Sequence, residues 1–139
     1  MKKILSLVLV ALLFTACSIS PKKIEYGKDM CSFCDMTIVE KTHAAQYVTK
    51  KGKAYKFDAI ECMLNDLKDK NVNEMAFILV TDYGNPTVLI DAEAATYLIS
   101  EEIKSPMGAN LSAFKDKGQI KNKGTHYNWN TIRAYFTKK

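Results

Sequence analysis

The chain has 139 residues, of which 47% are hydrophobic, and carries a formal net charge of +5 at pH 7. This length suits one compact domain and leaves too few residues for a second of ordinary size. The charge excess is too small to indicate nucleic acid as a partner. The chain also lacks an activated serine, paired carboxylates and a phosphate-binding glycine loop. We therefore expect no enzyme, no nucleic-acid partner and no small-molecule substrate.

The N-terminus carries the pattern of a bacterial export signal. Lys2 and Lys3 precede an apolar run over residues 4–14, and Phe14-Thr15-Ala16-Cys17 closes the segment. The apolar run is too short to span a bilayer, because a transmembrane helix needs about 20 residues. Small residues directly before a cysteine resemble the lipobox of bacterial lipoproteins, although Phe14 stands where Leu is usual.

This pattern predicts a lipid anchor. We expect residues 1–16 to be a lipoprotein signal peptide and Cys17 to carry diacylglycerol and an acyl chain such as palmitate. The polar residues 17–28 would form a tether. The protein would then be held on a membrane of the bacterial cell envelope, facing the periplasm or the outside. An ordinary secretory signal with a free Cys17 is the alternative.

The next segments predict a strand, a strand and a helix. Residues 45–48 and 54–57 alternate in hydrophobicity around a Lys-Gly-Lys turn, which predicts a β-hairpin. Asp58 then stands where a helix N-cap is favoured, and apolar residues recur at helical spacing up to about Lys70. The first expected unit is therefore ββα over about residues 42–70.

A second unit repeats this order. Strands are predicted at residues 75–81 and 87–90, and Asp91 then stands as the N-cap of a helix to about Ser100. The sequence Phe57-Asp58-Ala59 corresponds to Ile90-Asp91-Ala92. We therefore expect an α+β fold, with two related ββα-type units, at about 42–70 and 75–100, packed as one small domain over residues 29–139. Its sheets would be antiparallel, with helices on one face.

The C-terminal part is predicted with fewer elements. Leu111 to Phe114 favours another strand, a Lys-rich segment follows, and a short helix is expected from about Asn130 to Phe136.

The remaining cysteines favour a soft-metal site. Once Cys17 is lipidated, Cys31, Cys34 and Cys62 are left, and an odd count argues against a pure disulfide framework. Copper(I) prefers thiolate and thioether ligands, and Cys34 and Met36 can face the same side of an extended segment. Cys62, at helical spacing among apolar residues, is interpreted as a buried structural thiol.

Three other interpretations of Cys31-Ser32-Phe33-Cys34-Asp35-Met36 stay open. A thiol-redox pair would need a helix N-terminus to lower a thiol pKa, whereas β-prone residues follow here. A short structural disulfide is the second alternative. Zinc is the third, but it would need a second pair of Cys or His ligands, and Cys62, His43 and His126 follow at no recognised spacing.

Several motifs together resemble the NosL family of copper-chaperone lipoproteins. They cover about residues 29 to 116 and comprise Cys34-Asp35-Met36, Lys56-Phe57-Asp58 with Cys62-Met63, Ile90-Asp91 with Ala94 and Tyr97, and Ser105-Pro106-Met107-Gly108 with Ala113-Phe114. The resemblance implies a membrane-anchored copper(I) chaperone in which Cys34, Met36 and Met107 bind one ion. The implied recipient is a cuproenzyme, foremost nitrous oxide reductase, or its maturation and transport complex.

The chain departs from the family pattern at two positions. Asp35 replaces the usual Gly, and Cys31 adds a thiol. Cys31 is therefore a further candidate ligand, and His43, seven residues after Met36, is another. The alternative function is an exported thiol-disulfide oxidoreductase that uses Cys31 and Cys34.

Overall fold

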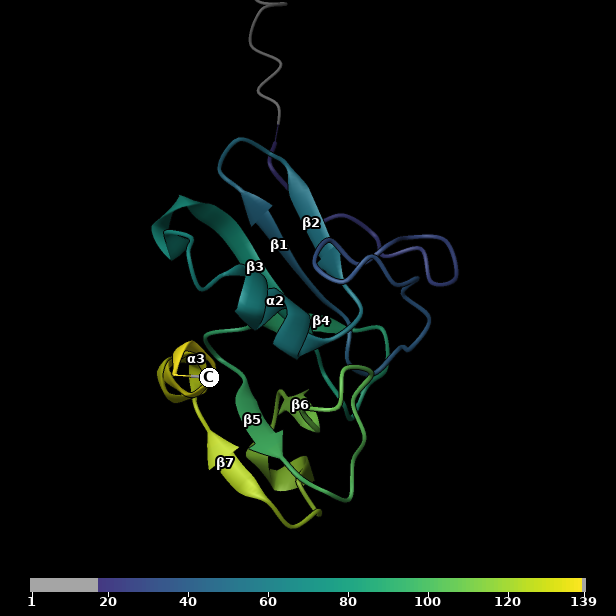
Figure 1. The fold of residues 1–139 in the computed structure, drawn as a ribbon, viewed down its shortest axis with the longest axis vertical. Helices are drawn as coiled ribbons and strands as arrows, with labels where there is room; N and C mark the ends of the chain where they lie inside the picture. Colours follow the sequence, from purple (N-terminus) through teal and green to yellow (C-terminus); the bar gives the residue numbers. More distant parts are fainter. Residues whose placement is uncertain (1–17, 139) are drawn as a thin grey trace, which may run out of the picture.

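The structure is a computed structural model that describes residues 18–138, and their strands form two antiparallel sheets (Figure 1). The first sheet has the order β2-β1-β3-β4 and the second β6-β5-β7. The strands are β1 (Ala45–Thr49), β2 (Ala54–Phe57), β3 (Met75–Thr81), β4 (Leu89–Asp91), β5 (Thr96–Ile99), β6 (Leu111–Phe114) and β7 (Thr125–Tyr127). The helices are α2 (Ile60–Asp66) and α3 (Trp129–Thr137), with 3-10 turns at Val72–Glu74 and Lys117–Gln119. The expected α+β class with antiparallel sheets is confirmed.

The first sheet is built around the predicted hairpin. Strands β1 and β2 pair with Tyr47 opposite Tyr55, and Gly52 takes φ 83 in the turn, a conformation that glycine adopts without strain. Strand β1 lies between β2 and β3, which explains why four of its five residues are buried. The Tyr47 ring stacks on Tyr55 at 4.8 Å between centroids. Helix α2 packs against β1 and β2, so this hairpin carries the helix that follows it.

Helix α2 differs from its prediction at both ends. Its N-cap is Ala59, which makes no side-chain capping bond, and the helix ends at Asp66 rather than near Lys70. Asp58 is buried and accepts a hydrogen bond from the Cys34 thiol instead of capping the helix. The N-cap prediction for Asp58 is therefore wrong, because a side chain distant in sequence takes up its carboxylate.

The helix expected from Asp91 to Ser100 is also wrong. The Asp91 carboxylate accepts hydrogen bonds from the backbone N–H groups of Glu93 and Ala94, at 2.7 and 3.3 Å, as an N-cap would. These bonds close a turn, after which β5 pairs with β6 and β7. Strands β3 and β4 therefore extend the first sheet, and the second sheet takes its helix from α3, which contacts β5, β7 and α2.

The tether before the first strand is shorter than expected. The buried Gln46 side chain accepts from Lys22 N at 2.7 Å and donates to Lys22 O at 2.6 Å, and Ile24 is buried in the core. Residues from Lys22 onward are thus part of the domain. The predicted signal peptide and Cys17 lie outside the described residues. Between residues 18 and 138, no helix has the length and apolar character needed to cross a membrane.

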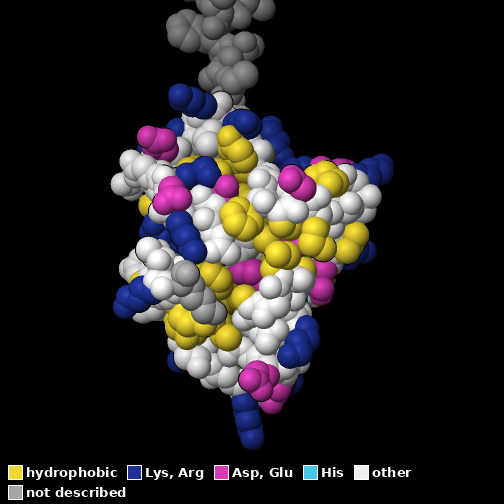
Figure 2. All heavy atoms as spheres, in the orientation of Figure 1, with side chains coloured by type: hydrophobic (Ala, Val, Ile, Leu, Met, Phe, Trp, Pro, Cys, Tyr) yellow, Lys and Arg dark blue, Asp and Glu magenta, His cyan; other side chains and the backbone are white. Residues whose placement is uncertain are grey.

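The surface is apolar near the segment that carries the sulfur-rich motif. Figure 2 shows hydrophobic side chains gathered over the loops that precede β1, with Lys and Arg side chains toward the edges of this face. The exposed large hydrophobic residues of that segment are Met30, Phe33, Met36 and Val39.

Candidate metal centre

Residues 31–36 form a closed turn. The N–H of Cys31 donates to Met36 O at 2.8 Å, and the N–H of Asp35 donates to Cys31 O at 3.1 Å. Asp35 has φ 60, in the left-handed region that glycine favours and that Asp tolerates better than most residues. The left-handed backbone explains why the NosL pattern has Gly at this position. Asp35 adopts the same left-handed conformation.

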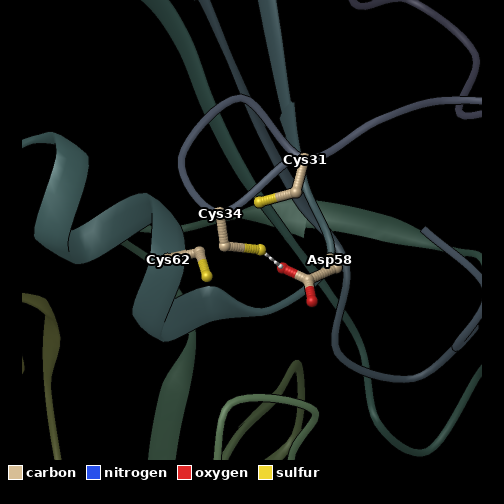
Figure 3. A group of neighbouring side chains, drawn as sticks. All are labelled: Cys31, Cys34, Asp58 and Cys62. Atoms are coloured by element: carbon tan, nitrogen blue, oxygen red, sulfur yellow. Dashed lines mark hydrogen bonds between the residues drawn. The ribbon is translucent and has the colours of Figure 1, made fainter. Parts of the chain in front are cut away.

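This turn brings two thiols to a third thiol and a carboxylate. The metal-binding atoms of Cys31, Cys34, Asp58 and Cys62 all lie within 4.8 Å of one another (Figure 3). Asp58 lies between β2 and α2, and Cys62 lies in the first turn of α2. Cys31, Asp58 and Cys62 are buried, whereas Cys34 is partly exposed. Cys34 is therefore the member of the cluster that an incoming ion or partner can reach.

Hydrogen bonds within the cluster make the thiols unequal. A hydrogen bond from Cys62 lowers the pKa of Cys31 to about 6, against the effect of burial, and the N–H groups of Cys34, Asp58 and Phe33 act in the same direction. Burial raises the pKa of Cys34 to about 11, and its thiol donates to Asp58 Oδ1 at 3.5 Å. Donation to Cys31, together with burial, raises the pKa of Cys62. Cys31 is therefore the thiol most ready to act as a thiolate.

The two predicted thioether ligands lie at the surface. Met36 and Met107 are 50% and 43% exposed. Met107 belongs to a loop over residues 105–109 whose Ser105 hydroxyl and Ala109 N–H both donate to Glu61 Oε1. Glu61 directly precedes Cys62 in α2, so the Met107 loop is fastened to the helix that carries the third thiol. The fold thus joins segments that are far apart in the chain.

His43 is not part of the cluster. Its ring is buried, with Nδ1 2.9 Å from Thr42 Oγ1 and Nε2 3.2 Å from Ser112 Oγ. Both ring nitrogens already have hydroxyl partners, and the ring lies edge-on to Tyr83. His43 is therefore a hydrogen-bonded core residue, which removes the basis for counting it as a further ligand.

The sequence interpretation missed Cys62 and Asp58 as cluster members. Cys62 is buried as expected, but its neighbours are two other thiols rather than apolar side chains alone. The available signal was the odd cysteine count, together with the spacing that places Asp58 and Cys62 four residues apart across a strand-to-helix junction. All three cysteines of the described chain are free thiols, and Cys31 and Cys34 lie in a turn rather than at a helix N-terminus.

Comparisons with known proteins agree with this architecture. No curated protein matches the chain. Among solved structures, the crystal structure of the copper chaperone NosL from Shewanella denitrificans is similar, with 20% sequence identity and a TM-score of 0.69. The match covers 81% of this chain and 95% of that one, which shows a shared fold. The family model named NosL matches residues 21–133. This chain therefore belongs to the NosL family.

Proposed function

We propose that this protein is a membrane-anchored copper(I) chaperone. It takes up copper(I) at Cys34, Met36 and Met107 and passes the ion to a cuproenzyme, most directly nitrous oxide reductase or its maturation and transport complex. The family membership and the similarity to a copper chaperone support this role. The role requires no catalytic step.

One observation carries the proposal: the accessible thiol of the cluster is followed two residues later by an exposed thioether. Cys34 is the partly exposed sulfur among four clustered donor groups, and Met36 follows two residues later at the surface. Thiolate and thioether are the ligands that copper(I) prefers. Oxygen-binding cations such as calcium and magnesium would find only one carboxylate here.

The exposed arrangement suits transfer. One thiolate and two thioethers around a monovalent cation form a site without net charge, and its thioether donors lie at the surface. A partner's thiolate or thioether can then bind the ion before the Cys34 bond breaks. The apolar residues Met30, Phe33 and Val39 of the same segment are exposed and would be covered by such a partner.

The proposed lipid on Cys17 would hold the domain at the membrane. The domain begins at Lys22, and five residues of extended chain span at most about 18 Å. Delivery would therefore take place at the membrane surface. Replacement of Cys17 by Ser in the full chain should release the protein from the membrane fraction, whereas Cys62→Ser should not.

The chaperone role is tested by copper(I) competition and transfer. Reduced protein beginning at Ser18 is titrated with copper(I) against a chromophoric chelator, and we expect one ion per chain. Cys34→Ala should weaken binding at least 100-fold. The loaded protein should activate copper-free nitrous oxide reductase, and Met36→Ala or Met107→Ala should slow transfer at least tenfold. Met30→Ala is the matched control, because Met30 is similarly exposed on the same loop.

The competing oxidoreductase role predicts a different result. In that case Cys34→Ala would bind copper(I) as the wild type does, and Cys31→Ser would abolish reduction of a disulfide substrate. This pair of results would show that the chaperone proposal is wrong. The full burial of Cys31 argues against the oxidoreductase role, since a partner disulfide could not reach that sulfur.

A further inference from the structure

We infer that Cys62 completes a three-thiolate seat with Cys31 and Cys34 that retains copper(I) inside the domain. The inference rests on the proposed function and adds a second position for the same ion. Both positions use Cys34. The outer position adds Met36 and Met107 and serves capture and release, whereas the inner position adds the two buried thiols and serves retention.

The spacing of the sulfur atoms suits one bound ion. Thiolate ligands with metal bonds of about 2.3 Å lie about 3.8 to 4.0 Å apart around a shared ion. The donor atoms of this cluster lie within 4.8 Å of one another. Small side-chain rotations therefore close the seat, and the backbone of the loop and of α2 can stay in place.

The backbone holds the two loop thiols in place. The N–H of Cys31 donates to Met36 O at 2.8 Å, and the N–H of Asp35 donates to Cys31 O at 3.1 Å. The N–H of Ser32 donates to Lys56 O at 2.8 Å, so the loop is bound to β2 two residues before Asp58. The positions of Cys31 and Cys34 beside Cys62 are therefore set by the backbone.

The donor set also favours copper(I) over zinc. Three sulfur atoms form a trigonal set that suits a soft monovalent ion, and a tetrahedral zinc site would need Asp58 as its fourth ligand. Asp58 Oδ1 accepts a hydrogen bond from the Cys34 thiol at 3.5 Å. When copper(I) binds, each coordinating sulfur gives up any proton it carries to water. Three thiolates and copper(I) together carry a net charge of −2, to which the neighbouring Asp58 carboxylate adds.

Burial provides the reason for retention. Cys31 and Cys62 are closed to solvent, so an ion held by them is hidden from competing ligands. Cys34 is the only partly exposed thiol of the three described cysteines. On this inference the ion moves outward by exchanging the two buried sulfurs for Met36 and Met107, with Cys34 bound throughout. The thiolates of the inner position bind copper(I) more tightly than the thioethers of the outer position, from which the ion is released.

The test compares equilibrium affinity in matched variants. Reduced protein beginning at Ser18 is titrated with copper(I) against a chromophoric chelator, and thiolate-to-copper absorption is followed in the ultraviolet. Cys62→Ala should weaken binding at least tenfold and reduce this absorption, whereas Met30→Ala, an exposed methionine outside both positions, should change affinity less than threefold. Thermal unfolding of the copper-free variants controls for folding. If Cys62→Ala does not fold, Cys31→Ala on the loop gives the same readout.

The outcomes separate this inference from the proposed function. If Cys62→Ala and Cys31→Ala bind copper(I) as the wild type does while Cys34→Ala does not, the inner seat is wrong and the chaperone role stands. If the wild type itself binds no copper(I), both fail. If an equal concentration of Zn²⁺ displaces copper(I), the three thiols form a zinc site and the inference is overturned.

Discussion

Replacement of Glu61 by Ala is expected to free the loop that carries Met107. The Glu61 carboxylate is buried, and its Oε1 accepts hydrogen bonds from the Ser105 hydroxyl and from Ala109 N, the latter at 3.3 Å. Its Oε2 has no partner among the described residues. Burial also raises the pKa of Glu61, which means that desolvation disfavours its charged form.

The magnitude can be worked from these contacts. A buried donor left without an acceptor costs about 1 to 3 kcal/mol, and Glu61→Ala leaves one buried donor, the Ser105 hydroxyl, and one partly buried donor, Ala109 N–H. Removal of the unpartnered, desolvated oxygen returns part of that cost. We expect a net loss of about 2 kcal/mol in the free energy of unfolding. Glu61→Gln should lose less, because it retains an acceptor for the loop.

The assay is urea unfolding of copper-free protein in a double-mutant cycle. Glu61→Ala, Ser105→Ala and the double variant should show a coupling energy of about 1 kcal/mol or more, as groups in one hydrogen-bond network do. Copper transfer from Glu61→Ala should slow toward the value of Met107→Ala. If the two single losses simply add, the Met107 loop is not held by Glu61 and the reasoning is refuted.

Three further predictions concern the backbone and His43. Asp35→Ala should lower stability by about 1 kcal/mol relative to Asp35→Gly, because φ is 60; equal urea midpoints would contradict this. Burial lowers the pKa of His43, although Glu40 opposes it, so the unfolded state binds more protons below pH 6.5. Unfolding free energy should therefore fall as the pH drops from 7 through 6, and His43→Gln, unlike His126→Gln, should flatten that fall. A Cβ on Gly124 would lie 2.3 Å from Ile99 O, so Gly124→Ala should cost about 1 to 3 kcal/mol, measured by thermal unfolding.

Elements with strong local patterns were predictable from the sequence. The hairpin β1–β2, strands β3 and β6 and helix α3 lie where the sequence predicted them, the hairpin from its alternation and β3 from its apolar, β-prone run. The helix predicted at residues 91–100 is absent for a local reason. Asp91 makes the same two short-range hydrogen bonds in a turn as in a helix N-cap. The conformation of residues 96–99 is instead decided by pairing with β6 and β7, which lie later in the chain.

The sequence by itself determined the sulfur-rich character of the segment and the candidate pair Cys34 and Met36, because these residues are neighbours in the chain. Tertiary structure alone decided what surrounds them. Asp58 and Cys62 reach Cys34 because β2 and α2 pack beside the loop, and Glu61 ties the distant Met107 loop to the same helix. Residue spacing describes only contacts within a few positions, whereas the donor set of a metal site depends on which side chains the packed elements bring within about 4 Å.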